Sequence, residues 1–258
     1  MLWPVASVLL LVIAAASTWA YLRDRARRKQ QNVFSKWPIG RVAVTEIDPV
    51  FRPGVLGPTL DTEVSLVGGV ELLPIVGGTS DLEAWILAVL SKRARVMFEF
   101  GTASGRTAYL WARNSPPDAK VVTLTLSAND IAVYRRESGD ADTDVRTALD
   151  ESKFSSFYYS GTPAASKVTQ LYGDSKTFDE TPWVGRCDLV FVDGSHALSY
   201  VQSDSRKALR LTKSGGLVLW HDYRGPTLRG VYDGLNALAS EIPLVHIKGT
   251  SLVAHRRP

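Results

Sequence analysis

Short apolar segments alternate with amphipathic segments from residue 79 onward, and this alternation limits the fold more than any other feature of the sequence. The apolar segments predict strands at residues 96–100, 120–126, 168–172, 188–192 and 216–220. The amphipathic segments predict helices at residues 81–92, 104–113, 129–137, 197–211 and 227–240. Strands that alternate with helices are joined by right-handed crossovers and form a parallel sheet covered on both faces. The pattern therefore predicts a doubly wound α/β fold.

Three further segments complete the expected architecture. Residues 244–248 and 251–255 predict a terminal hairpin that adds one antiparallel strand to the sheet. The polar stretch 138–166 predicts an insertion with a short helix, and residues 30–78, with several prolines and glycines, predict an irregular lead-in with one or two short strands. We therefore expect residues 79–258 to form a mostly parallel, Rossmann-like sheet with a C-terminal antiparallel hairpin.

The N-terminal segment predicts a membrane anchor. Residues 1–22 contain no charged side chain, and about 20 helical residues cross a hydrocarbon core of about 30 Å. Five basic residues follow within residues 23–29, whereas a secretory signal peptide has its positive charge before the apolar run. We expect a transmembrane helix at 1–22, with the N-terminus outside and the body in the cytoplasm, followed by a basic juxtamembrane segment and lead-in at 23–78. A cleaved signal peptide is the alternative.

The charge of the chain is concentrated in this arm. Residues 23–29 carry a net charge of +4, which equals the net charge of the whole chain, so the remainder is neutral. A domain that binds nucleic acid shows its excess of Lys and Arg on the folded body. We therefore expect no nucleic-acid partner.

The turn after the strand at 96–100 has the composition of a ligand-binding loop. Gly101 lets the chain turn tightly and approach a ligand, and Gly105 lets the next helix start close to it. Glu99, at the end of the strand, is able to accept hydrogen bonds from a cationic or hydroxylated ligand. Ala103 stands where a dinucleotide fingerprint has its middle glycine, which disfavours a nicotinamide oxidoreductase and favours a nucleoside without a pyrophosphate. A glycine turn with no ligand is the alternative.

The segment Glu99–Thr107 (EFGTASGRT) resembles the first motif of the class I S-adenosylmethionine-dependent methyltransferases. Five further segments resemble later motifs of that family, in the expected order: residues 121–127, 171–179, 187–196, 214–223 and 248–255. The sequence resembles bacterial small-molecule O-methyltransferases, some of which need magnesium. The resemblance implies an enzyme that uses S-adenosylmethionine to methylate a hydroxyl of a small molecule, sugar or glycolipid.

The resemblance also implies roles for individual residues of the cofactor site. The methionine part of the cofactor would be held by Glu99, Gly101, Thr102 and Gly105. Asp174, followed by Ser175 in a GDS turn, would contact adenine, although a plain Asx-turn is the alternative. Thr125 stands where the family offers a carboxylate to the ribose, and a neutral hydroxyl makes a hydrogen bond weaker by about 1–2 kcal/mol.

Acidic and histidine residues follow two other predicted strands. Asp193 and Asp222 come directly after apolar strands, so their side chains are expected to meet at the carboxyl edge of the sheet, with His196 and His221 close by in sequence. Asp193, His221 and Asp222 are candidate ligands of a divalent ion such as Mg²⁺, and Asp193 and His196 are candidate catalytic residues, with His196 as the base. The resemblance assigns the two aspartates to metal in metal-dependent relatives. Asp193 as a helix cap, with no metal, is the alternative.

A second function fits the same fold. A membrane-tethered binding or scaffold protein that has lost turnover is favoured by Thr125 and His221, because both depart from the family pattern. It is opposed by Glu99, Gly101, Gly105, Asp174, Asp193 and Asp222. For the enzyme, the expected partners are the membrane, through residues 1–22, and a small-molecule or glycolipid acceptor.

Overall fold

The computed structural model describes residues 14–21, 38–52, 61–65 and 78–258. The chain divides into two compact units, residues 1–38 and 39–258. In the first unit, residues 14–21 are helical. Within the described residues no helix is both long and apolar enough to span a bilayer. The rest of the expected anchor, residues 1–13 and 22, lies outside the described residues, so the anchor stays a prediction.

The second unit contains one sheet, which in the described residues has eight strands in the order β1-β7-β8-β6-β5-β2-β3-β4. The strands are β1 (Arg41–Val42), β2 (Val96–Phe100), β3 (Lys120–Thr125), β4 (Val168–Tyr172), β5 (Cys187–Val192), β6 (Thr212–Trp220), β7 (Val245–Ile247) and β8 (Val253–Arg256). Only β8 runs antiparallel to its neighbours β6 and β7 among the pairs of described strands. The predicted parallel sheet with one antiparallel strand from the terminal hairpin is confirmed.

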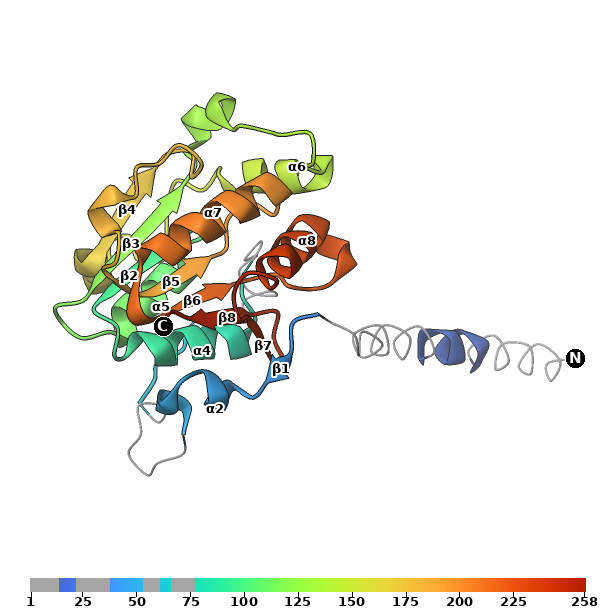
Figure 1. Cartoon of the computed structure of the whole chain (residues 1–258), viewed down its shortest axis with the longest axis horizontal. Helices are drawn as coiled ribbons and strands as arrows, with labels where there is room; N and C mark the ends of the chain where they lie inside the picture. The colour runs from blue at the N-terminus through green and yellow to red at the C-terminus, as the bar shows by residue number, and fades with distance from the viewer. Residues whose placement is uncertain (1–13, 22–37, 53–60, 66–77) are drawn as a thin grey trace, which may run out of the picture. The chain divides into compact units, whose positions relative to one another are not determined.

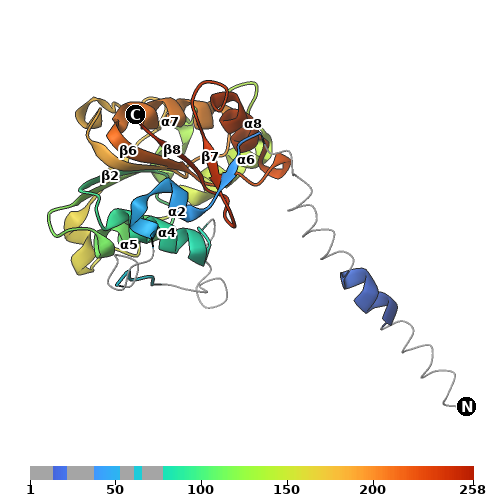
Figure 2. The same cartoon turned by 60° about the horizontal axis from the view of Figure 1, so that its bottom comes forward.

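Helices cover both faces of this sheet (Figures 1 and 2). The main ones are α4 (Asp81–Ser91), α5 (Arg106–Asn114), α6 (Asp142–Glu151), α7 (Leu198–Leu211) and α8 (Arg229–Leu238). Figure 2 shows the sheet edge-on, with α7 and α8 on one face and α4 and α5 on the other. This is the doubly wound arrangement that the alternating segments predict.

The lead-in contributes to the same domain. β1 pairs in parallel with β7 at one edge of the sheet, and the short helix α2 (Val44–Ile47) follows it. Val50 and Phe51, in a 3₁₀ helix after α2, are 3% and 5% exposed and belong to the hydrophobic core. Residues before position 79 therefore help to stabilise the sheet domain.

One predicted helix is wrong. Residues 129–137 were expected to form an α-helix. The structure instead has a 3₁₀ helix at Ala128–Val133, and residues 134–137 are not helical. Tyr134 stacks on Tyr200 of α7 with 4.4 Å between ring centroids, and the Arg135 N–H donates to the Tyr200 hydroxyl (2.8 Å). These tertiary contacts stabilise a non-helical conformation of residues 134–137 and outweigh the helix propensity of the segment.

The central strands are buried on both faces, because each lies between two layers of helices. Phe98 of β2, Val190 of β5 and Val218 of β6 are fully buried, as the apolar runs in the sequence indicate. The burial of these strands aligns their carboxyl ends along one edge of the sheet. The polar residues that follow them are thereby brought to one edge of the sheet.

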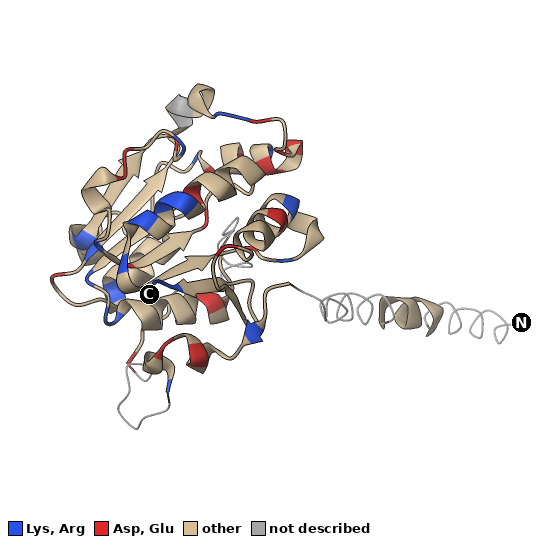
Figure 3. Cartoon of the chain, in the orientation of Figure 1, with Lys and Arg blue, Asp and Glu red and all other residues tan. Residues whose placement is uncertain are grey.

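The basic residues of α7 are paired with acidic residues. Arg206 forms an ion pair with Glu241 (2.6 Å), and Lys207 forms one with Glu180 (3.1 Å). Arg210 also pairs with Glu180. Figure 3 shows Lys and Arg interspersed with Asp and Glu over the domain.

Candidate active site

Two backbone segments pack directly against each other at the carboxyl edge of the sheet. Gly101, after β2, has a φ of +93°, and the Asp193 N–H donates to the carbonyl of Phe100 (2.9 Å). A Cβ atom at position 101 would lie 2.1 Å from the carbonyl oxygen of Asp193. Only glycine permits this contact, which places the motif turn beside Asp193.

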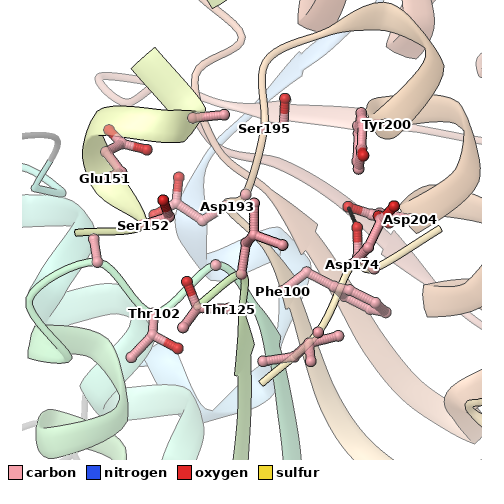
Figure 4. Close-up of a pocket in the computed structure, with 18 of the residues that line it drawn as sticks. Phe100, Thr102, Thr125, Glu151, Ser152, Asp174, Asp193, Ser195, Tyr200 and Asp204 are labelled. Atoms are coloured by element: carbon pink, nitrogen blue, oxygen red, sulfur yellow. Dashed lines mark hydrogen bonds between the residues drawn. The ribbon is translucent and has the colours of Figure 1, made fainter. Parts of the chain in front are cut away.

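A cavity opens above these two segments (Figure 4). It is lined by the turn after β2, the end of β3, the loop after β4, the loop after β5, and parts of α6 and α7. The residues expected from the sequence that line it are Gly101, Thr102, Thr125, Asp174, Ser175 and Asp193. The structure thus brings six candidate residues from four different parts of the chain to one cavity.

Glu99 and Gly105 differ from this set, because neither is among the described residues that line the cavity. Glu99 is 2% exposed, and its carboxylate accepts a hydrogen bond from the Thr123 hydroxyl (2.6 Å), which lies 2.8 Å from the Thr102 hydroxyl. Burial raises the pKa of Glu99 to about 8. Glu99 therefore supports the turn from behind, and Gly105 allows a close approach by Tyr159, whose ring would lie 2.8 Å from a Cβ atom there.

Asp174 makes the Asx-turn that the sequence offered as the alternative, and its contact with adenine stays a prediction. Its Oδ1 accepts the Lys176 N–H (2.9 Å), which makes the Asx-turn, while its buried Oδ2 has no hydrogen-bond partner among the described residues. Asp204 of α7, which sequence reasoning missed, lies beside it (Figure 4) and accepts a hydrogen bond from Ser175 (3.1 Å). Burial raises the pKa of Asp204 to about 7. The signal that could have identified Asp204 in the sequence is its position as a charged residue on the buried face of the predicted helix.

His196 and Asp222 form a close pair at the same edge. The Nε2 atom of His196 lies 2.8 Å from Oδ2 of Asp222, and Nε of Arg224 lies 2.8 Å from Oδ1 of Asp222. Burial disfavours a charged His196, but Asp222 outweighs this effect and raises the pKa of the imidazole. Asp222 has a φ of +61°, a conformation that L-residues rarely adopt and that occurs often at functional sites.

His221 lies among three carboxylates. Its Nδ1 is 2.9 Å from Oδ1 of Asp193 and 3.3 Å from Oδ2 of Asp222, and its Nε2 is 3.3 Å from Oε2 of Glu83. Burial opposes a charge on His221, yet Asp193, Asp222 and Glu83 raise its pKa well above the usual value. Glu83 also accepts hydrogen bonds from Ser80 and Ser251, so it is a fixed support for the ring.

These side chains fit a divalent cation. Asp193, His221 and Asp222 each offer one ligand atom, and the three atoms lie within 4.8 Å of one another. Among the residues that the structure describes, the buried Nδ1 of His221 has no partner with hydrogen-bond geometry, although it lies 2.9 Å from Oδ1 of Asp193. A ring nitrogen without a hydrogen bond is available to ligate a metal ion. Glu83 behind Nε2 completes the carboxylate–histidine arrangement that commonly orients a metal ligand.

The alternative role of Asp193 as a helix cap is not what the structure shows. The N-cap residue of α7 is Ala197, and no side chain caps that end of the helix. Ser195 accepts a hydrogen bond from the Ala197 N–H (3.2 Å), and its Oγ lies 2.8 Å from the Tyr134 hydroxyl. Asp193 is directed to His221 instead.

Glu151, the last residue of α6, is a second site residue that sequence reasoning missed. It lines the cavity together with Ala148 and Ser152 of the same segment. Burial, followed by the charge of Asp193, raises the pKa of Glu151 to about 7. Its spacing from Ala148 places both residues on one helix face, but a sequence does not show what that face meets.

Comparisons with known proteins concern the domain and its fold. Residues 98–223 match a family model described as a methyltransferase domain, and no curated protein matches the chain. The O-methyltransferase TomG from Streptomyces achromogenes, involved in tomaymycin synthesis and solved with S-adenosylmethionine, is 20% identical, with a TM-score of 0.51 over 76% of this chain and 88% of TomG. An O-methyltransferase from Bacillus cereus, solved with S-adenosylhomocysteine, is 20% identical, with a TM-score of 0.48 over 81% of this chain and 94% of that one. The family match identifies residues 98–223 as a methyltransferase domain, and the strand order is that of a mostly parallel, Rossmann-like sheet.

Proposed function

We propose that this methyltransferase acts on a hydroxyl of a small molecule, a sugar or a glycolipid. The observation that carries the proposal is the His196–Asp222 pair, 2.8 Å apart. His221 links this pair to Asp193, which lines the cavity that holds the expected cofactor residues. A hydroxyl needs a base to lose its proton during transfer, and imidazole titrates near neutral pH. An imidazole backed by a carboxylate supplies such a base.

The chain's residues have distinct parts in the reaction. The hydroxyl oxygen of the acceptor attacks the methyl carbon as the bond from carbon to sulfur breaks, and S-adenosylhomocysteine leaves. Asp222 lies at Nε2 of His196, so the lone pair of Nδ1 is the one that takes the hydroxyl proton. Asp222 is itself held by Arg224, which fixes the orientation of the imidazole.

Asp193, His221 and Asp222 would hold a divalent cation in this enzyme. When bound, such an ion lowers the pKa of a coordinated hydroxyl and orients it. A set with one imidazole nitrogen favours a transition ion such as Mn²⁺ more than an all-oxygen set does, although Mg²⁺ remains a candidate. Activity that disappears with a chelator and returns with Mn²⁺ or Mg²⁺ would support this role.

The proposed setting is the membrane. An anchor at residues 1–22 with a cytoplasmic body would place the cavity near acceptors made at the inner membrane face, such as a glycolipid or saccharide precursor. The basic segment 23–29 favours this orientation, because positive charges flank the cytoplasmic side of a span. External protease on intact cells should leave the body undigested, and digestion of the body would contradict this topology.

Calorimetric titration of the purified protein with S-adenosylhomocysteine, with and without Mn²⁺ or Mg²⁺, tests the proposal. We expect binding in the absence of metal, since the cavity residues from the motif turn and the GDS loop do not depend on an ion. Enhanced binding or a separate metal isotherm would support the metal site, and its absence would remove the metal role. No binding at millimolar ligand would contradict the enzyme and favour the inactive scaffold.

Thr125→Asp is expected to strengthen the binding of S-adenosylhomocysteine roughly tenfold, because a carboxylate at the end of β3 accepts stronger hydrogen bonds from ribose hydroxyls. Thr125 lines the cavity, so the added carboxylate has access to the ligand. Thr125→Val, which removes the hydroxyl at similar volume, is the control and should not strengthen binding. An unchanged affinity in Thr125→Asp would show that position 125 does not face the ribose.

A further inference from the structure

The methionine part of the cofactor carries a positively charged α-ammonium group, and the structure does not offer Glu99 to it. The Glu99 carboxylate is buried behind Thr123 and Thr102 and is absent from the cavity lining of the described residues. The carboxylates that do line the cavity are Glu151, Asp174, Asp193 and Asp204. One of these is better placed than the others for an ammonium group.

The four carboxylates lie in two groups within the cavity. Asp174 and Asp204 lie together with Tyr200 at one end of the cavity in Figure 4, and Glu151 lies at the other end with Asp193. Asp193 already faces another side chain, because Nδ1 of His221 is 2.9 Å from its Oδ1. That leaves Glu151 as the carboxylate at the Asp193 end of the cavity that pairs with none of the described residues.

Glu151 has the properties of a residue that awaits a cation. Among the described residues, none forms a hydrogen bond or an ion pair with its carboxylate. Asp193 is the charged group with the largest effect on Glu151, and as a like charge it raises the pKa of Glu151, an effect that His196 opposes. A positively charged group between Glu151 and Asp193 would remove this repulsion, inside the cavity that Gly101 and Thr102 also line.

We propose that the Glu151 carboxylate, and not that of Glu99, binds the α-ammonium group of the cofactor. The inference rests on the proposed use of S-adenosylmethionine and adds to it a residue from the insertion at 138–166. The helix α6 would then contribute to the cofactor site and not only to the acceptor site. Ser152, next to Glu151, is 3% exposed and donates to the carbonyl of Leu149 (2.8 Å), which fixes the end of α6 against the cavity.

The test compares two ligands that differ in the amino-acid tail. S-Adenosylhomocysteine carries the ammonium group, and 5′-methylthioadenosine has the same nucleoside and thioether without the tail. Calorimetry of the purified protein should show that Glu151→Gln weakens S-adenosylhomocysteine about tenfold or more, because a charge-assisted hydrogen bond is lost, and leaves 5′-methylthioadenosine unchanged. Asp150→Asn is the matched control: it removes the same charge from the neighbouring residue, which pairs with Lys153 and does not line the cavity, and should alter neither affinity.

Each other outcome overturns the inference in an identifiable way. Equal losses for both ligands would mean that Glu151 only supports the shape of the cavity. No loss for either would assign Glu151 to the acceptor. A loss for S-adenosylmethionine but not for S-adenosylhomocysteine would place it at the sulfonium. Failure of the unaltered protein to bind either ligand would instead contradict the proposed function.

Discussion

Gly101→Ala is expected to destabilise the domain by about 3 kcal/mol or more and to abolish the binding of S-adenosylhomocysteine. The new Cβ atom would lie 2.1 Å from the carbonyl oxygen and 2.6 Å from the carbonyl carbon of Asp193, and both belong to backbone that cannot rotate away. The φ of +93° adds strain for any residue with a side chain. The turn and the Asp193 loop would have to separate, and both line the cavity. Urea unfolding and calorimetry measure the two effects.

Gly161→Ala is the matched control for this substitution. Gly161 also has a positive φ, +72°, but a Cβ atom there would meet nothing within 4 Å. It should cost only about 1 kcal/mol, the price of the backbone conformation alone, and should leave ligand binding intact. If Gly101→Ala were no worse than Gly161→Ala and still bound the ligand, the contact between the motif turn and Asp193 would be wrong.

His196→Ala is expected to slow methyl transfer by about 10²–10⁴-fold and to leave the affinity for S-adenosylhomocysteine unchanged. His196 is paired with Asp222 and is not among the described residues that line the cofactor cavity, so its loss should affect the proton and not the nucleoside. The rate is measured as S-adenosylhomocysteine released from S-adenosylmethionine with a hydroxylated acceptor. Calorimetry measures the affinity.

His255→Ala separates this catalytic effect from the general loss of a histidine. His255 lies in β8, where its Nδ1 is 2.8 Å from the carbonyl of Pro243, so its loss should lower stability but not the rate per folded molecule. A fall in affinity equal to the fall in rate for His196→Ala would contradict the role of His196 as a base. Equal rates in the two variants would contradict it as well.

Much of the fold could be predicted because the physical signals are local. The apolar runs 188–192 and 216–220 are as buried in the sheet as their composition indicates. The polar residues after them, Asp193 and Asp222, meet at one edge because parallel strands end together. The positions of Asp193, His221 and Asp222 relative to one another follow from this rule, and the structure brings their ligand atoms within 4.8 Å.

The rest depended on neighbours that a sequence does not reveal. The strand pattern does not predict that Glu99 contacts Thr123 behind the turn. A strand buried on both faces is apolar at nearly every position, so the pattern does not show which way each side chain points. Glu151 could not be assigned, because the path of the insertion from β3 to β4 decides what α6 meets. The helix expected at 129–137 failed for the same reason: contacts of Tyr134 and Arg135 with Tyr200 override local propensity.

A crystal structure of the protein with S-adenosylhomocysteine tests the central claim most directly. We predict the adenine beside Asp174, the thioether sulfur on the side of Asp193, and the amino-acid tail above Gly101 and Thr102 with its ammonium group at Glu151. A ligand bound outside this cavity, or a cavity closed by the protein's own side chains while the ligand is present at saturating concentration, would contradict the account.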